Sequence, residues 1–131
     1  MKIAVLIARI LLGLIFLVFG LNFFLHFSFI PQSPPPAGKA GAFESGLFGS
    51  GYFFQYMKVI EILCGLFILI NRFTALFVLI VFPISLNIFL FHSILAPSGI
   101  PIGATILVLN LFLAYAYRKY YSSIFTATPV A

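Results

Sequence analysis

The chain has 131 residues, enough for one domain, and 63% of them are apolar, against about 45–50% in an average soluble protein. Seven residues are Lys or Arg and two are Asp or Glu, where a soluble domain of this length would carry roughly 33 charged residues. So few charges cannot cover a soluble surface, which excludes a soluble enzyme, a disordered chain and a nucleic-acid-binding protein. The net charge of +5 is therefore interpreted against a lipid bilayer.

Four stretches of the chain reach the length of about 20 mainly apolar residues that a transmembrane helix needs. Breaks that contain prolines, glycine or adjacent polar residues separate these stretches. The sequence therefore predicts an all-α, polytopic transmembrane four-helix bundle that forms a single domain over residues 1–131. The predicted helices cover about residues 3–27, 52–70, 73–95 and 100–117.

The loop of about residues 28–51 is more than a plain linker. Phe43, Leu47 and Phe48 share one face if this part is helical, which favours a short helix lying in the membrane interface. Glycines in the same stretch lower its helix propensity. A short interfacial helix and an ordered loop are left as equal alternatives.

The distribution of basic residues predicts how the bundle is oriented, because Lys and Arg gather on the cytoplasmic side of a membrane. One predicted side holds five basic residues and the other holds two, so both termini are expected in the cytoplasm and the Pro-rich loop outside. The first group is Lys2, Arg9, Arg72, Arg118 and Lys119, and the second is Lys39 and Lys58.

Polar side chains inside the predicted spans are candidates for a ligand site, because they are costly in hydrocarbon and face the bundle interior. With a rise of about 1.5 Å per residue, most of them lie between the membrane midplane and the outer surface. The candidate ligand-binding residues are Asn22, His26, Lys58, Glu61, Asn87, His92 and Asn110.

Each candidate also has a simpler structural interpretation. Glu61 either binds a proton or the head of a quinone, or it pairs with Lys58 three residues earlier on the same helix. The asparagines either line a pocket or join helices by hydrogen bonds. Arg9 is interpreted as a side chain that snorkels to lipid phosphate.

His26 and His92 lie on two helices that run in the same predicted direction, so together they could ligate one iron. Further ligands at metal spacing do not accompany them. A haem or metal site is therefore disfavoured, and hydrogen bonding by these histidines is favoured. A bound quinone is the cofactor that suits the polar cluster better.

Short segments with polar residues or glycine are spread through nearly the whole chain. They are Ala8-Arg9-Ile10-Leu11-Leu12-Gly13, Phe19-Gly20-Leu21-Asn22, the Pro-rich loop, Lys58-Val59-Ile60-Glu61, Asn71-Arg72, Pro83 with Asn87, His92, Pro97-Ser98-Gly99 and Tyr117-Arg118. Together they resemble the DoxX-like family of small bacterial membrane proteins. The resemblance implies a four-helix bundle in the bacterial inner membrane. The family name comes from a subunit of a quinone-reducing thiosulfate oxidoreductase, and relatives have been linked to redox-stress complexes.

The polar cluster and the resemblance predict a redox-associated inner-membrane subunit that binds a quinone or another small hydrophobic molecule in an outward-facing polar pocket. A small proton-coupled transporter and a scaffold subunit of a membrane complex are the alternatives. No catalytic activity of the chain alone is expected, because Ser-His-Asp, Cys-His and phosphate-loop arrangements are missing from the sequence. The expected partners are the lipid bilayer, other membrane or redox proteins and a second copy of the chain, with no nucleic acid.

Overall fold

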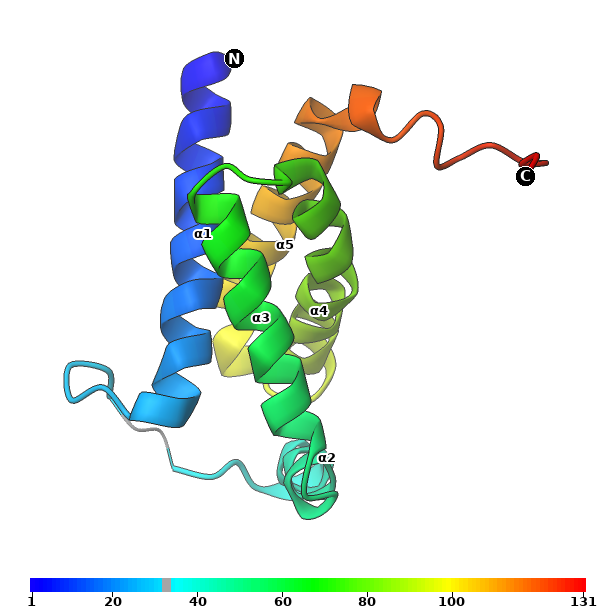
Figure 1. The fold of residues 1–131 in the computed structure, drawn as a ribbon. Coiled ribbons are helices and arrows are strands. Elements are labelled where there is room, and N and C mark those ends of the chain that lie inside the picture. Colours follow the sequence, from blue (N-terminus) through cyan, green and yellow to red (C-terminus); the bar gives the residue numbers. More distant parts are fainter. Residues whose placement is uncertain (32–33) are drawn as a thin grey trace.

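The structure is a computed structural model that describes residues 1–31 and 34–131; Gln32 and Ser33, in the predicted Pro-rich loop, lie outside the described residues. The described residues form five α-helices and two short 3-10 helices, without strands (Figure 1). The all-α fold class is therefore confirmed. The elements are α1 (Lys2–Leu25), α2 (Gly38–Gly49), α3 (Phe53–Leu69), α4 (Thr74–Ile94), η1 (Pro97–Gly99), α5 (Ile100–Ala116) and η2 (Arg118–Tyr120).

Four of the helices, α1, α3, α4 and α5, run alternately up and down beside one another (Figure 1). Each packs on the next in chain order, and α5 closes the bundle against α1. The N-terminus, the turn between α3 and α4 and the C-terminal segment lie at one end, which we call the terminal end. Helix α2 lies across the opposite end, which we call the α2 end, so the loop does contain a short helix.

Three to four segments are candidate membrane spans. Helices α1 and α4 and the segment Pro97–Ala116 are each long and apolar enough to cross a bilayer. The fourth candidate is α3, which meets the same test only together with α2, and the two are bent by 90°. With 17 residues, α3 is about 25 Å long, slightly less than a typical hydrocarbon core.

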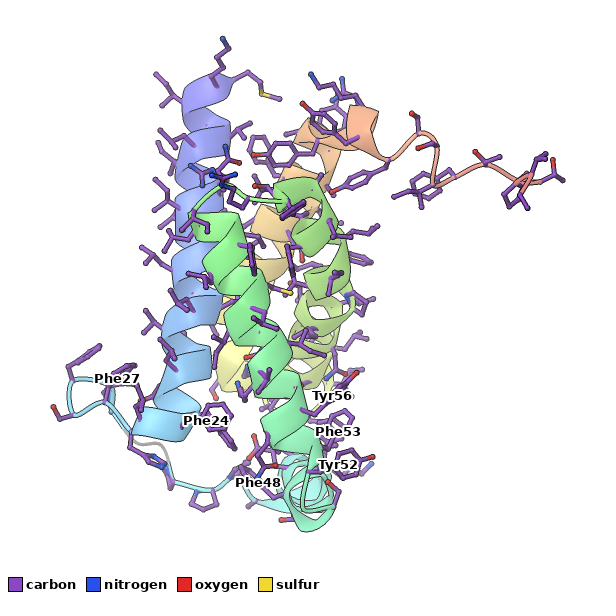
Figure 2. The ribbon with its side chains drawn as sticks, in the orientation of Figure 1. Phe24, Phe27, Phe48, Tyr52, Phe53 and Tyr56 are labelled. Atoms are coloured by element: carbon purple, nitrogen blue, oxygen red, sulfur yellow. The ribbon has the colours of Figure 1, made fainter. Side chains whose placement is uncertain are left out.

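Aromatic side chains surround the α2 end of the bundle. Figure 2 shows Phe24 and Phe27 around the end of α1, and Tyr52, Phe53 and Tyr56 around the start of α3, with Phe48 beside them on α2. Rings of this kind are enriched where a membrane protein passes from hydrocarbon to head groups. Their position matches an α2 end that lies at a membrane interface.

The sharp bend between α2 and α3 has a local cause. Gly51 has φ of 83°, a left-handed conformation that residues with a side chain rarely adopt. The neighbouring Ser50 hydroxyl donates to the Leu47 carbonyl (2.7 Å) and accepts a hydrogen bond from the Phe53 N–H (3.1 Å). One side chain thereby satisfies groups at the end of α2 and at the start of α3.

Helices α1 and α3 approach until their backbones touch. A Cβ atom on Gly65 would lie 2.5 Å from the Leu17 nitrogen and 2.8 Å from the Gly13 oxygen. A Cβ atom on Gly20 would lie 2.7 Å from a side-chain carbon of Ile62. Small residues that allow such contact are the usual basis of tight helix packing in membranes, where dispersion forces replace the hydrophobic effect.

Arg9 ties the same two helices together at the terminal end. Its Nη1 atom donates to the carbonyls of Ile68 (2.8 Å) and Leu69 (2.6 Å), in the last turn of α3. Carbonyls there have no partner within the helix and carry partial negative charge, so a guanidinium both satisfies and neutralises them. This differs from the snorkelling interpretation, because α3 ends within reach of Arg9.

The tightly packed core occupies the middle and the terminal half of the bundle. Its fully buried members come from all four long helices. They are Leu12 and Phe16 on α1, Cys64 and Ile68 on α3, Val78 and Val81 on α4, and Leu113 on α5. Beyond them the Tyr121 hydroxyl donates to the Ala75 carbonyl (2.7 Å), which fixes the segment after α5 to the start of α4.

The glycine contact between α1 and α3 gives a direct test. Gly65→Ala adds a methyl group against backbone atoms of α1, which can make room only if the whole helix shifts. We therefore expect a loss of about 1–3 kcal/mol in the free energy of unfolding. SDS-induced unfolding in mixed micelles measures it. Gly46→Ala on α2 is the matched control, since nothing lies within 4 Å of the new methyl group. That change should be neutral or stabilising by up to about 1 kcal/mol. Equal effects of the two changes would contradict the close contact.

Candidate functional site

Lys58 and Glu61 form an ion pair on the inner face of α3. Lys58 Nζ lies 3.0 Å from Glu61 Oε2, one helical turn away. Glu61 is 2% exposed, whereas the Lys58 side chain is 19% exposed. An acid at this depth in a membrane helix needs a charged partner or a protonated state, and the lysine supplies the partner. The pairing interpretation of Glu61 is thus seen directly, and it leaves open whether the pair also meets a ligand.

A cavity of about 330 Å³ lies next to this pair, between the helices of the α2 half. Ligand cavities of about 300–1,000 Å³ with apolar walls and a few converging polar groups are typical of small-molecule sites. Every one of the five α-helices contributes to the wall, which is mostly aromatic or aliphatic. Its polar side chains are Glu44, Lys58, Glu61, Asn87 and His92.

Helix α2 covers the cavity and brings Glu44 to it. The Phe48 ring stacks on Phe54 of α3 with centroids 4.1 Å apart, and the Phe43 ring lies 5.6 Å from Phe91 of α4. Glu44 lies between Phe43 and Phe48 in the sequence, and with α2 packed in this way it lines the cavity. Glu44 was not among the candidates predicted from the sequence, because no ligand site was expected in the loop. The chain has only two acidic residues, and that rarity could have marked Glu44 as a candidate.

His92 closes the cavity at the last turn of α4. Its Nδ1 atom lies 3.3 Å from the Ala96 carbonyl oxygen, which accepts if that nitrogen carries the proton. The ring also lies against Gly99 in η1 and Gly103 in α5, and a Cβ atom on Gly99 would collide with it. These neighbours fix the ring, so the edge that faces the cavity has a defined position.

Asn87 also lines the cavity but remains exposed. Within residues 1–31 and 34–131 its side chain makes no hydrogen bond. Helix α4 continues through Pro83, and Asn87 does not bond the backbone there. Its amide is therefore available to a molecule in the cavity.

Asn22 and His26 lie at the end of α1, and neither lines the cavity of about 330 Å³. The Asn22 side-chain oxygen accepts a hydrogen bond from the Phe27 N–H (2.9 Å), and Asn22 lines a smaller adjoining cavity together with Glu44 and Lys58. His26 is the C-cap of α1, with φ of 51°, and is exposed. The left-handed turn ends the helix at His26, so His26 lies outside the inner face of α1.

Asn110 is fully buried away from the cavity and joins α5 to α4. Its Oδ1 atom accepts a hydrogen bond from the Ser85 hydroxyl (2.6 Å), and its Nδ2 atom donates to the Val78 carbonyl (3.1 Å). With these bonds the side chain holds two helices together, in line with the structural alternative for the asparagines.

Groups of three or more His, Cys, Asp or Glu residues that could hold a metal ion do not occur in the part of the chain that the structure describes. Cys64 is a buried free thiol that does not line the main cavity. The site is thus a hydrogen-bonding and charged cavity, whose groups can bind and orient a small molecule.

The apolar helices and the cavity between them define the class: a multi-pass membrane protein, with three to four candidate spans, that encloses a partly polar cavity. Residues 4–93 match the model of the DoxX family, which is more than half of the chain. The protein therefore belongs to the DoxX family. Comparison with curated proteins gives no match, and neither does comparison with solved structures.

The exposed Asn87 on α4 and the buried Asn110 on α5 allow a matched test of which asparagine is structural. In a double-mutant cycle with Ser85→Ala and Asn110→Leu, we expect a coupling energy of about 0.6–2 kcal/mol from the hydrogen bond they share. SDS-induced unfolding of the four proteins measures it. Asn87→Leu breaks no hydrogen bond among the described residues, so it should leave stability nearly unchanged. A coupling energy near zero would show that the hydrogen bond between Ser85 and Asn110 does not stabilise the bundle.

Proposed function

We propose that the protein binds a small hydrophobic molecule with a polar head in the cavity of the α2 half, and that a quinone is the chemical class bound. The observation that carries the proposal is the partly buried Lys58–Glu61 pair at the wall of a mostly apolar cavity. The redox association rests on the family resemblance, and protein partners or a second copy of the chain are part of the same proposal.

The energetics of the ion pair favour a binding role. A buried pair contributes little to stability, because desolvation of both charges offsets their attraction, and well-packed apolar residues would often serve as well. A chain that keeps such a pair beside a cavity gains something else from it. An ammonium group carries three donors, and Glu61 occupies one of them at Lys58, so further hydrogen bonds to a ligand oxygen remain available.

A quinone suits this arrangement because it combines carbonyl acceptors with a flat apolar ring. Lys58 and Asn87 offer donors to its oxygens, and phenylalanines offer apolar contact to its ring. A volume of about 330 Å³ accommodates the ring with the beginning of a tail. The rest of an isoprenoid chain would extend into lipid.

The packing of the bundle disfavours the alternative of a proton-coupled transporter. Leu12, Ile68 and Leu113, each fully buried, fill the space between the Lys58–Glu61 pair and the terminal end. A transporter needs access to its site from both sides, and this core would have to open. A scaffold role has no specific observation in its favour and predicts an empty cavity.

We further propose that the protein lies in a bacterial inner membrane with both termini in the cytoplasm. The terminal end carries Lys2, Arg9, Arg72, Arg118 and Lys119, and the rule that positive charge stays inside places that end in the cytoplasm. The cavity of the α2 half then lies towards the outer face.

This orientation is testable with single cysteines, because the native Cys64 is fully buried. We expect a membrane-impermeant maleimide added to spheroplasts to label Ser45→Cys on α2 and to spare Ser123→Cys near the C-terminus. Both positions should react once the membrane is dissolved. Labelling of Ser123→Cys alone in spheroplasts would reverse the proposed orientation.

Substitution of Glu61 tests the quinone proposal. Glu61→Gln keeps the shape of the side chain but removes the charge that holds Lys58 in place, so we expect about tenfold weaker binding of a short-chain quinone. Equilibrium binding to protein in nanodiscs measures it, with empty nanodiscs subtracted. Leu63→Ala is the control on the same helix, since Leu63 is exposed and does not line the cavity.

Equal affinity of Glu61→Gln and the unchanged protein would remove Glu61 from the site. Absence of quinone binding to the unchanged protein would overturn the quinone class. In both cases the thermal stability of each variant in detergent shows whether the bundle is intact.

A further inference from the structure

The charges of this chain are distributed unevenly around the cavity. The chain has two acidic residues, Glu44 and Glu61, and both line this one cavity although they lie on different helices. Of its seven basic residues, Lys58 alone does so. A protein with a net charge of +5 thus places a formal charge of −1 around its main cavity, with His92 counted as neutral.

The two acids differ in their partners. Glu61 is bound to Lys58, so that pair is close to neutral as a unit. Glu44 takes part in no ion pair within residues 1–31 and 34–131, and it is half-buried under α2. The negative charge that a ligand meets is therefore centred on Glu44, in surroundings where apolar walls weaken solvent screening.

The aromatic wall of the cavity also favours a cation over an anion. Phe16, Phe19, Phe43, Phe54 and Phe91 line the cavity. The face of an aromatic ring carries partial negative charge and attracts cations, and cages of such rings bind quaternary ammonium groups in other proteins. An anion of the same size would be repelled by Glu44 and by every ring that presents its face to the cavity.

From this arrangement we infer that the cavity binds a lipophilic monocation, such as an aromatic quaternary ammonium ion, in preference to an anion of similar size, with Glu44 as the carboxylate that faces the cation. The inference rests on the proposed ligand cavity but not on the quinone. It adds a second ligand class to the same site.

The position of Glu44 also indicates the path of the cation. Glu44 lines the main cavity, the adjoining cavity of about 280 Å³ with Asn22, and a third of about 390 Å³ formed with Pro34 to Pro36. The third cavity lies in the loop region outside the bundle. Glu44 is thus the residue shared by all three spaces, and a cation would reach the main cavity from the α2 end.

The test compares two water-soluble probes of similar size and opposite charge, benzyltrimethylammonium and benzenesulfonate. Isothermal titration of the full chain in zwitterionic nanodiscs measures both, with empty nanodiscs subtracted. We expect the cation to bind at least about tenfold more tightly than the anion. Glu44→Gln should lower the affinity for the cation about tenfold, and Glu44→Asp, which keeps the charge, should restore most of it.

Lys39→Gln is the matched control, because Lys39 lies on the same helix, is exposed and does not line the main cavity. It should leave the affinity for the cation unchanged. Equal binding of cation and anion would overturn the inference, and so would cation binding that Glu44→Gln does not weaken. Binding of a short-chain quinone without the cation would overturn the inference alone. Absence of binding by quinone and cation together would overturn the proposed function as well.

Discussion

The close contact of α1 with α3 is the constraint on which the rest of the structure depends. Gly13 and Gly65 let the two backbones touch, and this contact requires the two glycine faces of α1 and α3 to lie against each other. That arrangement leaves Glu61 and Cys64 facing inwards. It also brings the last turn of α3 to Arg9, which donates to two carbonyls of that turn. The depth and direction of the ion pair therefore follow from two residues without side chains.

Polar side chains in the two halves of the bundle differ in whether they have hydrogen-bond partners on a neighbouring helix. Asn110 and Ser85 near the middle of the bundle, and Arg9 in the terminal half, have partners on a neighbouring helix, so their polar atoms serve packing. In the α2 half, Lys58 keeps free donors, and Asn87 has no bond among the described residues. Unsatisfied polar groups beside a cavity cost free energy unless a ligand or water meets them. This difference separates the structural polar residues from the candidate binding residues.

Sequence analysis predicted the fold class and the family correctly because both depend on features that hydropathy and short segments reveal. Long apolar runs give the helices, and the Pro-rich and Asn71-Arg72 breaks give the turns. The short helix α2 stayed an alternative, since its glycines oppose the pattern of Phe43 and Leu47; packing of α2 on the bundle overrides that low propensity.

The candidate site was less predictable, because depth alone does not show which way a side chain points. Asn87 and Asn110 have similar sequence surroundings, yet one lines the cavity and the other is enclosed between α4 and α5. His26 was a candidate because the predicted first helix extended to about residue 27, yet a left-handed residue ends the helix at His26 and leaves it exposed. Glu44 depended on how α2 folds back over the bundle, a long-range feature of the structure. The quinone and the redox role stay predictions.

The polar chemistry of the cavity lies within the part of the chain that defines the family. Glu44, Lys58, Glu61, Asn87 and His92 all fall inside residues 4–93, on α2, α3 and α4. Helix α5 lies outside that match and lends the cavity only the apolar Ile102 and Ile106. Its one buried polar side chain, Asn110, forms hydrogen bonds with Ser85 and with the Val78 carbonyl. Helix α5 therefore completes the packing around a site whose charges come from the other helices, and changes confined to α5 should alter the shape of the cavity more than its preference for charge.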